Sequence, residues 1–262
     1  MLAKERQNQI LEYLKQNKII SITEIVKRFD VSHETARRDL EYLKDQNLVK
    51  RIHGGAVFEE NSSADSIAYT DQGTLGYVER AAIGQAAAEL VSTGDSVLLG
   101  MGSTVLEVAK NLKQKSNITV ITNAIPIIME LIRTEVDVHI LGGRLNHDEL
   151  NITGYTVRDT LSKYYVDKAF ISAGGITFQN GISDYSSDDA EFIRMITERA
   201  KTVILVAQSN KFGVNAFASE CSLKDIDIVV SDKNLSEEFV RGIQELGISL
   251  ILADLPENLD TP

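Results

Sequence analysis

The chain has 262 residues, a formal net charge of −11, 43% hydrophobic residues and 25% charged residues. This composition is typical of a soluble globular protein with a buried core, and it excludes a chain that is disordered over most of its length. The length lies above the usual single-domain range of about 100–150 residues. We therefore expect either one large domain or a small domain joined to a larger one.

The charge is unevenly distributed along the chain. Residues 1–58 carry 11 Lys and Arg against 8 Asp and Glu, which leaves 16 against 30 for residues 59–262. DNA affinity comes largely from Lys and Arg that neutralise phosphates, and an acidic surface repels them. Any contact with nucleic acid is therefore expected in the first 58 residues.

Neither the cysteine content nor the N-terminus indicates secretion. Cys221 is the single cysteine, so an intramolecular disulfide is excluded and a reducing compartment is expected. We interpret it as a small buried apolar residue rather than a reactive thiol. The N-terminal run MLAKERQNQILEYLKQ is charged and amphipathic, so it predicts neither a signal peptide nor a membrane span. A cytoplasmic location is the default expectation.

The first segment predicts three short helices and a hairpin. Apolar residues at helical spacing predict helices over residues 3–17, 22–29 and 32–46, with Ser21 and Glu24 in capping-box positions and Ser32 as an N-cap. Alternating residues around Gly54 and Gly55 predict a β-hairpin over residues 47–58. We predict a winged helix-turn-helix domain over residues 1–58, a polar linker over 59–76 and a second domain over 77–262.

The third predicted helix has the form of a recognition helix. Ala36, Leu40 and Leu43 form its buried stripe, so the polar side chains of its first turns face outward. A helix of this kind usually presents its N-terminal residues to base edges in the major groove, and a hairpin can add phosphate or minor-groove contacts. A lone Arg pair is more often a solvated face, but the joint pattern favours DNA binding. The candidate DNA-binding residues are Ser32, His33, Glu34, Thr35, Arg37, Arg38, Lys50, Arg51 and His53.

The larger segment alternates strand-length apolar runs with amphipathic helices. Continuous runs of Val, Ile and Leu suit strands buried on both faces, which predicts an α/β fold with a mainly parallel sheet. The predicted strands cover residues 96–99, 118–121, 136–141, 168–173, 202–206, 226–230 and 248–252. The predicted helices cover residues 78–91, 104–112, 125–133, 188–199 and 237–245.

Polar or glycine-rich segments follow several of these strands. Residues 99–104 (LGMGST) open a helix directly after a strand, where backbone NH groups, the helix start and two hydroxyls favour an anion such as phosphate. The segments 122–123, 141–144, 173–175 and 210–213 also follow strands, and ligands of open α/β sheets bind beyond the carboxyl ends of strands. The segment 99–104 alone is equally well explained as a structural turn, and each of the other four segments alone is better explained as a loop. Their joint placement favours one ligand site.

At these residues the sequence resembles a known family. The run VSHETARRDLEYLKDQNLVKRIHGGA resembles the DNA-binding signature of the DeoR family of bacterial repressors of sugar metabolism. GMGST, TNAIPI, LGGRLN, DKAFISAGGI and SNKFG resemble the successive motifs of that family's effector domain. The resemblance implies a sensor similar in fold to ribose-5-phosphate isomerase and glucosamine-6-phosphate deaminase. It also implies binding of a phosphorylated sugar or sugar acid, with the phosphate held by Gly102, Ser103 and Thr104 and the site lined by Asn123, Gly142, Gly143 and Lys211.

Two positions depart from the family pattern. Gly100 stands where many relatives have Asp, and Gln208 stands where many have Asp three positions before the lysine. Both changes remove a carboxylate that can accept hydrogen bonds from sugar hydroxyls. They bear on the identity of the effector, whereas Ser103, Thr104 and Lys211 of the phosphate site are retained.

Two functions remain open at this point. The first is a DNA-binding regulator, a repressor of a carbohydrate-utilisation operon controlled by a metabolite, with double-stranded operator DNA, a small effector and a second copy of the chain as partners and no membrane partner. The second is a sugar-phosphate isomerase or deaminase with an added DNA-binding head, for which Asp184, Lys211 and less readily Glu191 are the acid-base candidates. A structural role suits both carboxylates better, so no catalytic residue is predicted. No cofactor is expected, nor a metal, because His33, His53, His139 and His147 lack metal-ligand spacing.

Overall fold

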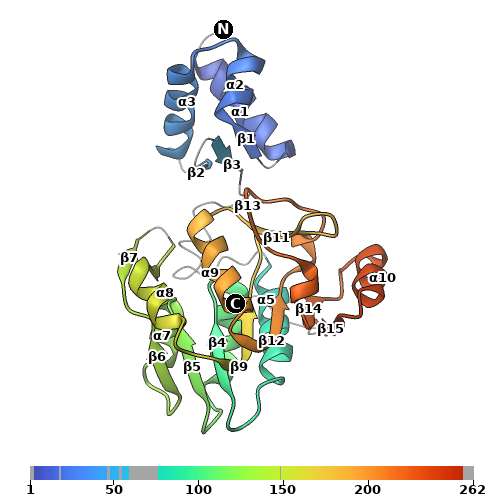
Figure 1. The fold of residues 1–262 in the computed structure, drawn as a ribbon. Helices are drawn as coiled ribbons and strands as arrows, with labels where there is room; N and C mark the ends of the chain where they lie inside the picture. Colours follow the sequence, from blue (N-terminus) through green and yellow to red (C-terminus); the bar gives the residue numbers. More distant parts are fainter. Residues whose placement is uncertain are drawn as a thin grey trace. The chain divides into compact units, whose positions relative to one another are not determined.

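The structure is a computed structural model that describes residues 3–17, 19–45, 48–52, 55–58, 76–147 and 149–255 (Figure 1). The chain divides into two compact units, Met1–Asp71 and Gln72–Pro262. The linker predicted over residues 59–76 lies outside the described residues except for Gly76. Each unit is described by itself below.

The first unit is a winged helix-turn-helix. Its helices are α1 (Ala3–Asn17), α2 (Ile22–Phe29) and α3 (His33–Asp45), and its strands are β1 (Ile19–Ser21), β2 (Lys50–Ile52) and β3 (Gly55–Val57). The strands form an antiparallel sheet in the order β1-β3-β2. The predicted helices and hairpin are confirmed. The short strand β1 was not predicted, because its pairing with β3 is non-local.

The core of this unit consists of the apolar stripes of its three helices and the inner side of the small sheet. The stripe residues Ala36, Leu40 and Leu43 are buried, as predicted. Ser21 caps α2 by accepting a hydrogen bond from Glu24 N at 3.1 Å. The Glu24 carboxylate accepts from the hydroxyl of Tyr13 at 2.5 Å, so the Glu of the expected capping box ties α2 to α1. The other buried residues are Ile10, Leu14, Ile20, Ile22, Ile25, Val49 and Ala56.

The second unit is built on a seven-stranded parallel sheet in the order β15-β14-β12-β9-β4-β5-β6. Its strands are β4 (Ser96–Leu99), β5 (Thr119–Thr122), β6 (Asp137–Ile140), β9 (Val166–Ile171), β12 (Ala200–Val206), β14 (Ile228–Asp232) and β15 (Ser249–Ala253). All seven overlap the strands predicted from the sequence. The prediction of an α/β fold with a mainly parallel sheet is confirmed.

Helices cover both faces of this sheet. The crossovers from β4 to β5 and from β5 to β6 run in one direction and the later ones run back, so right-handed connections place the two sets of helices on opposite faces. The first face carries α5 (Tyr77–Ala88), which packs closely on α6 (Ser103–Leu112), and α7 (Ile125–Leu131). The second face carries α8 (Tyr155–Leu161), α9 (Ser187–Thr197) and α10 (Glu237–Glu245).

Short elements that the sequence did not reveal surround the carboxyl edge of the sheet. They are the hairpin β7 (Arg144–Asn146) and β8 (Asn151–Thr153), and a small antiparallel sheet of β10 (Gly175–Thr177), β11 (Gly181–Asp184) and β13 (Ala218–Cys221). Two 3-10 turns, η1 (Ser209–Lys211) and η2 (Leu223–Asp225), complete the unit. No helix in the described ranges is long and apolar enough to cross a membrane.

Candidate functional sites

The recognition helix is fixed by a buried ion pair. Asp39 follows Arg37 and Arg38 in α3 and is 2% exposed. Its carboxylate accepts hydrogen bonds from Arg6 Nε at 2.6 Å and Arg6 Nη2 at 3.2 Å, and from Gln7 Nε2 at 3.0 Å. These bonds join α3 to α1 and set the rotation of α3. Arg37 and Arg38, the two residues before Asp39, are exposed.

The residues predicted to contact DNA lie at the start of α3. Ser32, His33 and Glu34 are exposed and Thr35 is half-buried. Ser32 Oγ accepts a hydrogen bond from Thr35 N at 3.1 Å, so the predicted N-cap forms. Arg38 Nε lies 3.3 Å from Glu34 Oε1, with the two side chains 80% and 65% exposed. Such a solvated pair contributes little and can open for a phosphate or a base.

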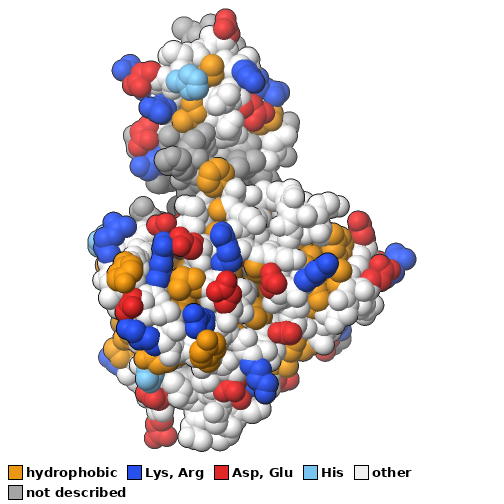
Figure 2. All heavy atoms as spheres, viewed as in Figure 1, with side chains coloured by type: hydrophobic (Ala, Val, Ile, Leu, Met, Phe, Trp, Pro, Cys, Tyr) orange, Lys and Arg blue, Asp and Glu red, His pale blue; other side chains and the backbone are white. Residues whose placement is uncertain are grey.

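The wing is described only in part. Lys50 and Arg51 lie in β2, where the backbone pairs with β3, and their side chains fall outside the described set, as does the whole of His53. Figure 2 shows both basic and acidic side chains on the visible surface of the first unit. The described residues of this unit therefore bear on DNA contact through α3, whereas the contacts proposed for the wing stay a prediction.

In the second unit, the order of the strands reverses between β4 and β9. The strands that follow β4 are added toward one edge of the sheet, and those that follow β9 are added toward the other. The two strands are neighbours, and the helices after them lie on opposite faces. Gly100 N donates to Phe170 O at 2.9 Å, and Ser172 Oγ donates to Met101 O at 2.7 Å. These bonds hold the exits of both strands together at the point where open α/β sheets bind ligands.

The predicted phosphate segment opens α6 at this point. Gly102 is the N-cap with φ of 108°, and a Cβ on it would lie 2.3 Å from Ser172 Oγ. Glycine is therefore required both by the backbone conformation and by the close approach. Ser103 is half-buried and Thr104 is buried. The first NH groups of α6 have no partner within the helix, which makes this turn suitable for an anion.

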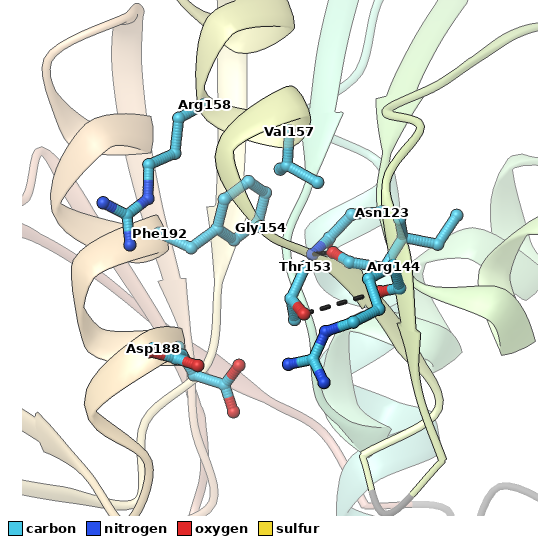
Figure 3. Close-up of a pocket in the computed structure, with 10 residues that line it drawn as sticks. Asn123, Arg144, Thr153, Gly154, Val157, Arg158, Asp188 and Phe192 are labelled. Atoms are coloured by element: carbon cyan, nitrogen blue, oxygen red, sulfur yellow. Dashed lines mark hydrogen bonds between the residues drawn. The ribbon is translucent and has the colours of Figure 1, made fainter.

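A cavity of about 80 Å³ lies on the same edge of the sheet (Figure 3). Arg144 and Asp188 face each other across it, with Arg144 from β7 on one wall and Asp188 from α9 on the other. Arg158 carries a second guanidinium, which lies 2.6 Å from Glu191 Oε1. The lining residues are Asn123, Arg144, Ile152, Thr153, Gly154, Val157, Arg158, Asp188, Asp189 and Phe192.

Buried polar side chains lie between this cavity and the phosphate segment. Asn123 Nδ2 donates to Ile152 O at 2.9 Å and lies 3.8 Å from Met101 Sδ. Asn151 Nδ2 donates to Asp189 Oδ1 at 3.1 Å and also contacts Met101 Sδ. Asn123 and Asn151 are both almost fully buried, and the side-chain oxygen of each has no hydrogen-bond partner among the residues that the structure describes. A buried acceptor without a donor is costly, so these oxygens suit a ligand that carries hydroxyl or amino groups.

Two buried carboxyl groups of this unit, those of Asp189 and Glu220, have raised pKa values. Burial, with the nearby charges of Asp184 and Glu149, raises the pKa of Asp189 to about 7. Burial together with Asp184 and Asp189 also raises the pKa of Glu220 well above its ordinary value. The Nε and Nη2 groups of Arg194 donate to the backbone carbonyls of Glu220 and Ser219. A donor-bearing ligand would favour the ionised form of Asp189.

Lys211 lies in η1 at the exit of β12. Asp232, fully buried at the end of β14, accepts from Ser209 N at 2.7 Å and holds this turn in place. Gln208, at the position where many relatives have Asp, donates from Nε2 to Gly76 O at 3.0 Å. Arg80 lies close by, since a Cβ on Gly76 would be 2.5 Å from Gln208 Nε2 and 3.4 Å from Arg80 Nη1. Arg80 is thus a basic side chain beside Gln208 that the sequence had not indicated.

The predicted effector residues all lie at the carboxyl edge of the sheet, but in separate parts of it. Of the seven, Asn123 lines the cavity, and Gly102, Ser103 and Thr104 form the adjacent start of α6. Gly143 makes a close approach, since a Cβ there would lie 2.5 Å from Thr153 O, whereas a Cβ on Gly142 would meet nothing within 4 Å. Arg144 lies in the predicted segment 141–144 but was not among the seven predicted effector residues, and sequence reasoning missed Asn151 and Asp189. Asn151 and Asp189 had no sequence signal, because only the fold of β8 and α9 brings them together.

The acid-base candidates of the enzyme hypothesis have other partners. Asp184 Oδ1 accepts from the backbone NH groups of Tyr185 at 2.5 Å and Ser186 at 3.2 Å. Glu191 pairs with Arg158 at the surface. Cys221 is buried in β13, and its burial raises the pKa of the thiol to about 12, so the reactive thiolate is disfavoured.

A winged helix-turn-helix unit followed by an α/β unit with a polar cavity defines the class of two-domain regulators. Comparisons with known proteins agree. The family model of the DeoR-like helix-turn-helix domain matches residues 6–62, and that of the DeoR C-terminal sensor domain matches residues 76–233. The chain belongs to the DeoR family.

Several relatives match the chain along almost its full length. The HTH-type transcriptional repressor GlcR of Bacillus subtilis is 34% identical over 99% of this chain and 100% of its own length. The glycerol-3-phosphate regulon repressor of Escherichia coli is 30% identical over 87% of this chain and 90% of its own. A solved ribose 5-phosphate isomerase from Methanocaldococcus jannaschii is 16% identical over 51% of this chain and 53% of its own, with a TM-score of 0.39. That likeness is too distant to carry an argument about activity.

Proposed function

We propose that the protein is a transcriptional repressor of a carbohydrate-utilisation operon. On this proposal it acts in the cytoplasm, binds double-stranded operator DNA through its first unit and is controlled by a phosphorylated sugar or sugar acid bound to its second unit. The observation that carries the proposal is the pairing of Asp39 with Arg6, which fixes α3 with Arg37 and Arg38 exposed. Two relatives, one named as a transcriptional repressor and one as the repressor of a glycerol-3-phosphate regulon, support the same interpretation.

The DNA arm uses the first turns of α3 in the major groove. Arg37 or Arg38 would pair with a guanine edge, whereas Ser32, Thr35 and the helix start would contact phosphates. His33 and Glu34 would lie at the same surface, and Lys50, Arg51 and His53 of the wing would add backbone contacts. Glu41, which is exposed in the third turn, lies further along the helix and away from the proposed contact zone.

In the second unit, we place the phosphate and the hydroxyl groups of the effector in two adjacent parts of the site. Its phosphate would bind the start of α6 at Gly102, Ser103 and Thr104. Lys211 and Arg144 would be its counter-charges, and Gly142 and Gly143 would lie in the loop before Arg144. Its hydroxyl groups would donate to the side-chain oxygens of Asn123, Asn151 and Asp189. The two asparagines contact Met101, which precedes the phosphate segment, through their side-chain nitrogens. The departures at Gly100 and Gln208 shift the acceptor groups from those two positions to this buried set.

The enzyme alternative is less favoured. General acid-base chemistry needs a free carboxylate or imidazole over the sugar carbons, and Asp184 and Glu191 already have the partners given above. The relatives that match over the whole chain are named as regulators. Assays of purified protein with ribose 5-phosphate and glucosamine 6-phosphate decide the point, and turnover that disappears in Lys211→Ala would overturn our ranking.

The regulatory proposal is tested in two stages. Selection of binding sites from random DNA duplexes with the full chain yields its operator, and fluorescence anisotropy then measures the affinity of the chain for that operator. A thermal-shift screen of sugar phosphates and sugar acids yields the effector, since a ligand at 100 times its Kd stabilises the native state by about 2.7 kcal/mol. Because the coupling is reciprocal, the effector must change operator affinity by the factor by which operator changes effector affinity. An operator affinity that no bound metabolite alters would refute the control mechanism.

A further inference from the structure

Large apolar side chains are exposed at one edge of the parallel sheet. Met129 and Ile132, three residues apart at the end of α7, are 64% and 63% exposed. Ile140 at the end of β6 and Leu145 in β7 are also exposed. Contiguous exposed apolar surface on a soluble unit marks a site of association.

The strand at this edge is open. β6 pairs with β5 on one side, and in the part of the chain that the structure describes no strand pairs with its other side. None of its four residues is buried, since Asp137 and Ile140 are exposed and Val138 and His139 are half-buried. An open edge of this kind is a template for pairing with another strand.

The exposed apolar residues lie on the same face of the sheet as one another. Ile140 pairs with Thr122 in the register, and His139 pairs with Ile121. His139 contacts the ring of Tyr164, which follows α8, with centroids 5.8 Å apart, so its side chain lies on the α8 face. Ile140 therefore lies on the opposite face, the one that α7 covers with Met129 and Ile132. The open strand edge thus has three exposed apolar residues on the α7 face, Met129, Ile132 and Ile140, which we call the apolar shelf.

We propose that a second copy of this chain covers this edge, with β6 pairing antiparallel to β6 of the partner copy across a two-fold axis through Val138. The sheets of the two copies would then join into one, and the two apolar shelves would pack against each other. This arrangement does not rest on the proposed effector. It supplies the two-fold symmetry that a dimer needs to read two half-sites.

The charges of β6 select this register. Residues opposite each other in an antiparallel pair must lie on the same face, so the axis passes through a residue. An axis through Val138 places Asp137 opposite His139 of the partner copy twice, and Val136 opposite Ile140. An axis through Asp137 would oppose two carboxylates, and an axis through His139 would oppose two imidazoles. Asp137 and His139 already lie 3.2 Å apart within the chain, which shows that the acid and the imidazole attract each other here.

The first test is the association state of the full chain by analytical ultracentrifugation. We expect a dimer, or a multiple of dimers, at micromolar concentration. The double variant Met129→Lys with Ile132→Lys should weaken dimerisation at least tenfold, because four like charges would meet in the shelf. Leu246→Lys is the control and should leave the dimer intact, because Leu246 is an exposed apolar residue, at 43%, that precedes the opposite edge strand. A monomeric wild type, or an unchanged dimer in the double variant, would overturn the proposal.

The second test fixes the register and does not depend on how well the Lys variants fold. In an antiparallel pair the Cα atoms of opposite residues are about 4.5–5.5 Å apart, which is within disulfide range. Val138→Cys should therefore give a cross-linked dimer under mild oxidation, whereas Leu246→Cys should not. The native Cys221 does not compete, because it is buried and its pKa is raised to about 12. Cross-linking through His139→Cys in place of Val138→Cys would overturn the assigned axis.

Discussion

Asn151 Nδ2 donates a hydrogen bond to Asp189 Oδ1 at 3.1 Å, and this pair joins the β7–β8 hairpin to α9 beside the cavity. Neither residue belongs to a motif of the sequence. Asn151 is fully buried and its own oxygen has no partner among the described residues, while Asp189 is nearly buried among other acidic groups. Burial of these acceptor oxygens therefore costs free energy when the cavity is empty. It also favours a ligand that donates hydrogen bonds to them.

The first prediction concerns the pH dependence of stability. The carboxyl of Asp189 has a pKa of about 7 in the folded chain and an ordinary value of 3.8. As the pH rises from 4 to 7, the unfolded chain loses this proton while the folded chain keeps it, so this group lowers stability progressively across that window and then no further. The loss is on the order of 4 kcal/mol, since the two pKa values differ by about 3 and one pKa unit is about 1.36 kcal/mol.

Urea unfolding of the wild type and of Asp189→Asn between pH 4 and pH 8 measures this contribution. The variant cannot ionise at position 189, so its free energy of unfolding should fall less across the window, with the largest gain over wild type above pH 7. A variant whose pH profile runs parallel to that of the wild type would show that Asp189 keeps an ordinary pKa.

The second prediction separates stability from DNA contact within α3. Asp39→Ala leaves the Arg6 guanidinium buried without its carboxylate, and breaking such a pair costs about 3–5 kcal/mol. Hydrogen exchange of the amides of α1 and α3 in the full chain should accelerate accordingly, and operator binding should be lost with the fold of the head. Exchange rates that match the wild type would contradict this role of Asp39.

Arg38→Ala should act in the opposite way. Its side chain is 80% exposed, so amide exchange in α3 should stay unchanged while operator affinity falls by about 1–3 kcal/mol, the cost of a lost base contact. Lys44→Ala, in the last turn of the same helix, removes an equal charge from its other end and serves as the control. Equal losses in the two variants would indicate general charge attraction rather than a specific contact by Arg38.

The sequence was sufficient for the parts of the molecule that depend on local pattern. The stripe Ala36, Leu40 and Leu43 and the Val, Ile and Leu runs of the large sheet are periodic signals, and the structure confirms them. By contrast, β1, the β7–β8 hairpin and the sheet of β10, β11 and β13 contain strands of only three or four residues. Their pairing partners lie far along the chain or beyond irregular turns, so no periodic pattern in the sequence predicts these strands.

The candidate site also contains some residues that local sequence can predict and others that only the fold brings together. Strand exits at Gly102 and Asn123 can be predicted, because glycine-rich and polar runs after apolar strands are visible in sequence. Met101, Asn151 and Asp189 come from three separate elements and meet only in the folded chain. The free-energy cost of burying these polar groups depends on that environment, so it cannot be predicted from the residues one at a time.

The third prediction addresses the two guanidinium groups of the cavity. In the described residues no carboxylate pairs with Arg144, whereas Arg158 pairs with Glu191 at 2.6 Å. A charge-assisted hydrogen bond contributes about 1.5–3 kcal/mol, so Arg144→Ala should weaken binding of an anionic effector by about tenfold or more. Arg158→Ala should have the smaller effect, because its charge is already partly neutralised. Calorimetric titration of both variants with the effector from the thermal-shift screen measures the difference, and the reverse ranking would place the anion on the α8 side of the cavity.

The last prediction uses two glycines that the sequence assigned to the same site. Gly102 has φ of 108°, and a Cβ there would lie 2.3 Å from Ser172 Oγ, so Gly102→Ala must both strain the backbone and displace the serine that holds the β4 exit. Thermal denaturation should show a loss of about 1–3 kcal/mol in the free energy of unfolding, together with weaker effector binding.

Gly142→Ala is the matched control, because a Cβ at Gly142 meets nothing within 4 Å. Its stability should stay within about 0.5 kcal/mol of wild type, so that any loss of effector binding in Gly142→Ala reports contact with the ligand itself. Wild-type stability in Gly102→Ala would mean that the close approach to Ser172 is relieved at no cost.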